Sequence, residues 1–131
     1  MAILLSVALV WPPLVAEGRA TRYDPGVMDQ VIANRLRWGQ LDLSQPHRDY
    51  VALADCGRLN EQVWLLLADG RVSGPHLVAD CGAAHDQAHL AAIGFAVDLS
   101  WELAVALGAL DAPLAGVRVL GASPALVGRV E

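Results

Sequence analysis

Two aspartates, Asp80 and Asp98, each stand at the end of a short apolar run, at residues 77–79 and 93–97. Apolar runs of this length are typical of buried β-strands. We therefore expect the rest of the chain to bring the two carboxyl groups to one surface. A pair of carboxyl groups, one protonated and one ionised, can act as general acid and base, for example in the cleavage of a glycosidic bond. Asp24 is a third candidate for such a pair.

Each of these aspartates also has a structural interpretation. Asp98 stands shortly before a predicted helix and can accept hydrogen bonds from backbone N–H groups there. Asp80 can shape the turn before Gly82, and Asp24 begins the turn sequence Asp-Pro-Gly. The sequence leaves the structural and the catalytic interpretation open for all three.

The two cysteines, Cys56 and Cys81, lie in identical Ala-Asp-Cys-Gly tetrapeptides 25 residues apart. In an exported protein we expect them to form a disulfide, whereas in a cytosolic protein they would remain thiols. Cys81 beside His85 is also conceivable as a peptidase nucleophile. A disulfide at Cys81 would exclude that possibility.

His85, Asp86 and His89 have a spacing at which two histidines can share a helix face and bind zinc, with Asp80 as a further ligand. However, the segment is predicted to be a loop, and it lacks the glutamate of a metalloprotease helix. We interpret the histidines as solvated loop residues. We therefore predict no metal site and no cofactor.

Length and composition indicate one globular domain. The chain has 131 residues, of which 55% are hydrophobic and 18% are charged, so it can bury a core of its own. The formal net charge is −5 and lysine is absent, which argues against nucleic acid as a partner.

The first residues are apolar. Residues 2–10 form an apolar run that Trp11 extends and two prolines end, as in the core of a secretory signal peptide, although no basic residue precedes Arg19. The alternative is a first buried β-strand. The run is too short for a transmembrane helix, which needs about 20 apolar residues. We expect a signal-peptide-like segment over 1–19 and no membrane span in the mature chain.

Six short strands and one clear helix are expected after that. The helix covers 101–107 and begins at Ser100, a good N-cap residue. Residues 27–38 have a mixed pattern, which predicts an irregular loop or one helical turn. So many strands with so little helix favour a small barrel over a doubly wound sheet. The strands are predicted at residues 20–23, 50–54, 62–68, 71–79, 93–97 and 117–120.

Three segments carry a resemblance to a known family. They read Ala-Thr-Arg-Tyr-Asp at 20–24, Val-Ala-Asp-Cys-Gly at 78–82 and Val-Asp-Leu-Ser at 97–100. Together they resemble the double-psi β-barrels of the RlpA-like, barwin and expansin group. The resemblance implies a secreted or cell-envelope protein that acts on polysaccharide, either peptidoglycan or a plant-type glucan.

The resemblance also implies roles for single residues. Asp98 matches the aspartate that acts as general acid in the expansin-related endoglucanases, and Asp24 matches their opening aspartate. RlpA-like lytic transglycosylases carry a glutamate where this chain has Leu36, which counts against that activity. Barwin-like barrels also occur as protein-interaction or inhibitor modules.

The tryptophans complete the candidate site. Trp38 lies in a polar stretch and is the best candidate for stacking on a sugar ring, whereas Trp64 and Trp101 are expected to pack against the barrel. We expect Tyr23, Trp38 and His85 to contact a glycan.

We therefore predict a mainly β protein, a small six-stranded double-psi β-barrel over residues 20–124 with one or two short helices and a C-terminal tail over 125–131. It is expected to be a secreted or cell-envelope monomer that binds cell-wall polysaccharide. The alternatives are a glycan-cleaving enzyme that uses Asp98 as general acid, with Asp24 or Asp80 as its partner, and a protein-interaction module.

Overall fold

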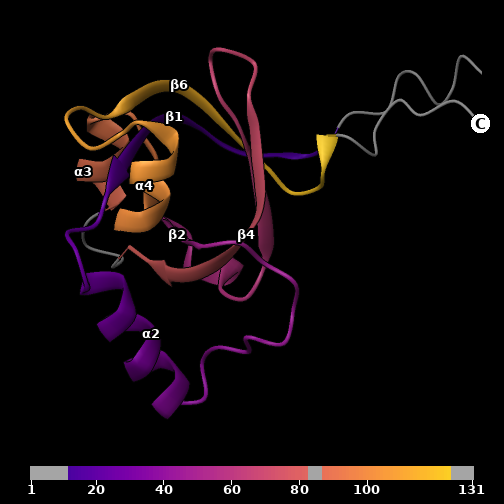
Figure 1. The fold of residues 1–131 in the computed structure, drawn as a ribbon, viewed down its shortest axis with the longest axis vertical. Coiled ribbons are helices and arrows are strands. Elements are labelled where there is room, and N and C mark those ends of the chain that lie inside the picture. The colour runs from indigo at the N-terminus through magenta and orange to yellow at the C-terminus, as the bar shows by residue number, and fades with distance from the viewer. Residues whose placement is uncertain (1–11, 83–86, 125–131) are drawn as a thin grey trace, which may run out of the picture.

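A closed barrel of six strands forms the body of the protein (Figure 1). The computed structural model describes residues 12–82 and 87–124. Neighbouring strands around the barrel follow the order β1-β5-β2-β4-β3-β6. Pairs β1–β5 and β2–β4 are parallel, and the other pairs are antiparallel. The strands are β1 (Leu14–Arg22), β2 (Tyr50–Leu53), β3 (Gln62–Leu66), β4 (Val72–Cys81), β5 (Phe95–Leu99) and β6 (Leu114–Leu120). The prediction of a mainly β, six-stranded barrel is confirmed.

Alternation along the strands separates the barrel interior from its outer surface. In β5, Val97 and Leu99 are fully buried in the main core, while Asp98 between them points to the opposite side. In β2, Val51 and Leu53 belong to the same core, whereas Ala52 joins a second, smaller cluster. The strands thus carry an outward-facing set of residues next to the second cluster.

Helix α2 (Val27–Arg37) packs on that second cluster. Met28 and Ile32, one helical turn apart, are its buried side chains, and they pack against Ala52. The prediction of an irregular loop or one helical turn over 27–38 was wrong, because Val27–Arg37 form a helix of 11 residues. The apolar stripe is narrow because only these two side chains are buried, so the helical period is weak in the sequence.

Two further helices and a 3₁₀ turn complete the structure. Helix α4 (Trp101–Leu107) begins where predicted, since the Ser100 hydroxyl accepts the backbone N–H of Leu103. Helix α3 (Gln87–Ala92) occupies part of a segment expected to be a loop. The 3₁₀ turn η1 (Cys56–Arg58) follows β2. With three α-helices among the described residues, the chain has more helix than the sequence pattern suggested.

Strand β1 is longer than the predicted strand at 20–23. It begins at Leu14, which pairs with Leu120 of β6. Gly18 lets β1 pass close to the turn before β5, because a Cβ atom there would lie 2.2 Å from the carbonyl oxygen of Gly94. The signal-peptide-like segment over 1–19 stays a prediction, since residues 1–11 lie outside the described part. No helix in that described part is long and apolar enough to cross a membrane.

Candidate functional site

The strand register places Asp80 and Asp98 in one row on the outside of the barrel. Asp98 pairs with Thr21 of β1 on one side and with Ala52 of β2 on the other, and Ala52 also pairs with Asp80 of β4. Because β4 and β5 both neighbour β2, the Cα atoms of the two aspartates lie roughly 10 Å apart. The structure therefore brings these two predicted residues to one surface.

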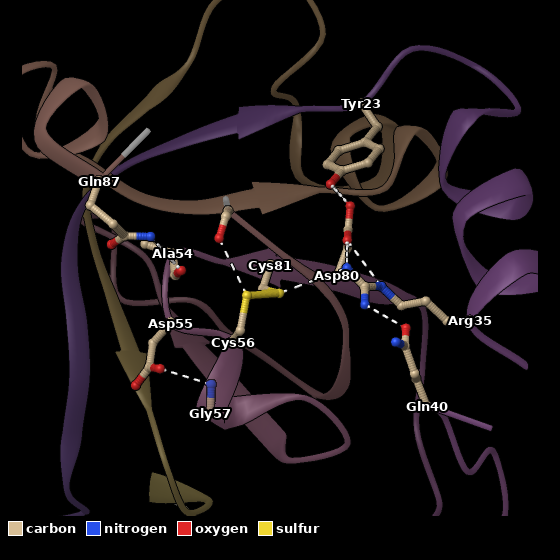
Figure 2. The surroundings of a disulfide bond; sticks show 11 residues. Tyr23, Arg35, Gln40, Ala54, Asp55, Cys56, Gly57, Asp80, Cys81 and Gln87 are labelled. Carbon is tan, nitrogen blue, oxygen red and sulfur yellow. Dashed lines mark hydrogen bonds and ion pairs between the residues drawn. A yellow bond between two sulfur atoms is a disulfide. The ribbon is translucent and has the colours of Figure 1, made fainter. Parts of the chain in front are cut away.

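Asp80 is the ion-paired member of the row. The Nη2 and Nε atoms of Arg35 lie 2.5 and 3.1 Å from its Oδ1 atom, and the Tyr23 hydroxyl donates to Oδ2 at 2.5 Å. Gln40 accepts a hydrogen bond from the other end of the same guanidinium at 2.9 Å. Figure 2 shows Tyr23 and Arg35 reaching the carboxylate from different sides. Both carboxylate oxygens thus have donors, and the negative charge is neutralised.

Tyr23 is hydrogen-bonded to Asp80 and lines the same pocket as Asp98. Burial raises the pKa of its hydroxyl far above the ordinary value, and the hydrogen bond to Asp80 and the negative charges of Asp80 and Asp98 raise it further. Tyr23 is therefore a neutral hydroxyl that holds its proton toward Asp80 at every physiological pH.

Asp98 is in a different environment. Burial raises its pKa from 3.8 to about 6, and the charge of Asp80 acts in the same direction. The hydroxyl of Thr21 donates to Oδ1 at 3.0 Å and opposes part of this rise. Asp98 therefore retains its proton to higher pH than an ordinary aspartate, and a carboxyl group with such a raised pKa beside a pocket is a candidate general acid.

Asp98 opens onto a pocket of about 270 Å³. Of the two aspartates, it is the one that lines the pocket. The polar side chains of Tyr23 and His89 share the lining with an apolar wall. A pocket with an apolar wall and a few polar groups is the usual form of a small-ligand site. The other lining residues are Ala52, Leu53, Cys81, Gly82, Leu90 and Phe95.

Helix α3 forms one side of this pocket. Gln87 at its start donates to the carbonyl oxygen of Ala54 at 2.8 Å, which ties the helix to the end of β2 (Figure 2). Leu90 packs closely on Gly82, where a Cβ atom would lie 2.9 Å from the Leu90 Cδ1 atom. These contacts hold His89 and Leu90 beside Asp98.

The predicted disulfide between Cys56 and Cys81 is confirmed, with an S–S distance of 2.08 Å. It joins η1 to the end of β4, directly after Asp80 (Figure 2). The bond therefore fixes the strand that carries Asp80 and forms part of the pocket rim. It also excludes Cys81 as a free nucleophile in this state.

The other predicted site residues lie elsewhere. Asp24 has an 80% exposed side chain, pairs with Arg22 at 2.9 Å and lines a different pocket. Trp38 is 63% exposed at the end of α2 and is absent from the pocket lining, so its role in binding stays a prediction. His85 lies outside the described residues. Trp64 and Trp101 are both half-buried.

Sequence reasoning missed Arg35. The spacing between Ile32 and Arg35 could have indicated it. Arg35 follows Ile32 by three residues and therefore lies on the same barrel-facing side of α2. That signal depended on recognising the helix first.

Within residues 12–82 and 87–124, no group of three or more His, Cys, Asp or Glu side chains is placed to hold a metal ion. No protein-family model, curated protein or solved structure matches the chain. The site is thus characterised by its own geometry.

Proposed function

We propose that this barrel binds cell-wall polysaccharide in the pocket beside Asp98 and cleaves a glycosidic bond there. One observation carries the proposal. Asp98 is a half-buried carboxyl group with a pKa of about 6, it lines an open pocket, and its neighbour Asp80 is ion-paired. A general acid needs both access to substrate and a proton near the working pH, and Asp98 meets both requirements.

In the proposed reaction, the carboxyl group of Asp98 donates its proton to the glycosidic oxygen. The bond from this oxygen to the anomeric carbon breaks, and positive charge develops on the sugar ring. Asp80 takes no part in the proton transfer, because its two oxygens are already bonded to Arg35 and Tyr23; it holds the Tyr23 side chain at the pocket wall. Water, or a hydroxyl group of the substrate itself, then attacks the cationic carbon, and Asp98 takes up the proton released.

The pocket lining supports a sugar ligand. Leu90 and Phe95, both partly exposed, offer an apolar wall for the C–H face of a pyranose, while Tyr23 and His89 offer hydrogen-bonding groups. Support for polysaccharide as the substrate class also comes from the resemblance to double-psi barrels. The two parallel strand pairs are in keeping with that assignment, and a disulfide favours an oxidising, exported location.

Binding without cleavage is the second candidate. It is favoured by Leu36, which occupies the position of the transglycosylase glutamate and is 43% exposed on α2. A leucine there has no proton to donate. In this case the pocket would hold the glycan, and Asp98 would contribute a hydrogen bond only.

The test uses the full chain, with its disulfide oxidised, incubated with peptidoglycan and with β-glucans at pH 5.5. Soluble fragments are identified by mass spectrometry. Asp98→Asn is compared with Asp69→Asn, an exposed aspartate in the turn between β3 and β4. Fragments that disappear only with Asp98→Asn would support cleavage. Retention on the insoluble glycan without fragments would support the binding candidate. If the protein neither releases fragments nor stays on the glycan, the proposal is wrong.

A further inference from the structure

A second pocket, of about 330 Å³, lies at the end of β1. Thr21 lines it, and the hydroxyl of Thr21 is also the group that donates to Asp98 at 3.0 Å. Asp98 in turn lines the first pocket. The two pockets are therefore neighbours, separated by the hydrogen-bonded pair of Thr21 and Asp98.

The sheet register explains why a pocket forms at this place. The pairing of β1 with β6 ends at Ala20, whereas its pairing with β5 continues through Thr21 and Arg22. From Thr21 onward, the edge of β1 that faced β6 has no strand partner within residues 12–82 and 87–124. The segment 109–113 approaches that edge instead, and the Nε atom of Arg22 donates to the carbonyl oxygen of Leu110 at 3.1 Å.

The lining of the second pocket is part polar and part apolar. Arg22 is held at two points, by the carbonyl of Leu110 and by the carboxylate of Asp24 at 2.9 Å. Asp24 and Asp111 add carboxylate acceptors, and Leu110 and Pro113 add apolar surface. Carboxylate and guanidinium groups beside apolar surface can bind the hydroxyl groups and the C–H face of a neutral sugar ring.

We propose that this pocket is a second sugar subsite, so that a glycan chain spans both pockets and presents the bond between two sugars to Asp98. This inference rests on the proposed function. A general acid must lie at the bond that it protonates, and Asp98 lines the first pocket while its hydrogen-bond partner Thr21 lines the second. Asp24 is then a binding residue of the second subsite, not the catalytic partner that the sequence suggested.

The subsite predicts that affinity depends on glycan length. Binding of β-1,4-linked N-acetylglucosamine oligomers of one to six sugars to the full chain is measured by calorimetry. With the unmodified chain we expect affinity to rise at least about tenfold from one sugar to four, as a second subsite adds contacts. Ala112→Trp, which places an indole in the second pocket, should remove this rise and leave single-sugar binding unchanged.

Ala115→Trp is the matched control, because Ala115 is exposed on β6 and lines a different pocket. Asp24→Ala opens the second pocket instead of filling it. The affinity for long oligomers should fall by about tenfold, which is the effect of losing one hydrogen bond to a charged group. Circular dichroism checks that each variant is folded. If the affinity still rises with glycan length in both Ala112→Trp and Asp24→Ala, the second subsite is wrong, while the proposed function is unaffected. No binding of any oligomer, together with no released fragments, would overturn the proposed function as well.

Discussion

Replacing Asp98 by asparagine should stabilise this protein at neutral pH. In the folded state the pKa of Asp98 is about 6, whereas an unperturbed aspartate has a value of 3.8. The folded state therefore binds the proton more tightly than the unfolded state does. Below pH 3.8 the group is protonated in both states and carries no penalty. As the pH rises from 3.8 to about 6, the unfolded state loses this proton while the folded state keeps it, so stability is lost; above about 6 the folded state also ionises and the loss reaches its full value.

The magnitude follows from the two pKa values. A rise from 3.8 to about 6 corresponds to about 3 kcal/mol, since each pKa unit is worth about 1.4 kcal/mol. Water that reaches Asp98 through the pocket reduces this value, so we expect a gain of about 1–3 kcal/mol for Asp98→Asn at pH 7. The asparagine oxygen still accepts the Thr21 hydroxyl, so the variant removes the charge and keeps the hydrogen bond.

The assay is urea denaturation of the oxidised full chain and of Asp98→Asn, at intervals from pH 4 to pH 8. Titrating groups remote from residue 98 are common to both proteins and cancel in the difference between their free energies of unfolding. This difference should be close to zero near pH 4 and should reach its plateau above pH 6. A difference that is independent of pH, or a variant that is less stable at pH 7, would refute a raised pKa at Asp98.

Three further predictions concern the same site and the barrel around it. If Asp98 is the general acid, the rate of glycan cleavage should fall about tenfold per pH unit above about 6, measured as fragment release against pH. Arg35→Met leaves Asp80 charged, largely buried and without its guanidinium partner, so urea denaturation should show a loss of about 3 kcal/mol. Gly18→Ala places a methyl group 2.2 Å from the carbonyl oxygen of Gly94, and its free energy of unfolding should fall by about 3 kcal/mol or more.

Matched controls exist for the two stability predictions. Arg37→Met removes an exposed arginine from the same last turn of α2 and should change stability by less than about 0.5 kcal/mol. Gly39→Ala also replaces a glycine with positive φ, but nothing lies within 4 Å of the added methyl group, so it should cost only about 1 kcal/mol. Equal losses for Gly18→Ala and Gly39→Ala would mean that β1 does not pass Gly94 as closely as described.

Local patterns in the sequence were sufficient for much of the fold. Apolar runs that end at Asp80 and Asp98 identify β4 and β5, and Ser100 marks the start of α4, because strand alternation and helix capping act over a few residues. Helix α2 was harder to predict, since two buried side chains make a weak helical pattern.

The sequence by itself determined which residues carry charge, which runs are buried and that two cysteines stand in matching tetrapeptides. Only the tertiary structure decided how these residues combine. Arg35 meets Asp80 across 45 positions of sequence, and Thr21 meets Asp98 across 77. The raised pKa of Asp98 depends on burial beside those partners, and the position of Asp24 in a separate pocket depends on where β1 loses its pairing with β6. Such properties depend on distances between strands that are remote in sequence, which no local pattern specifies.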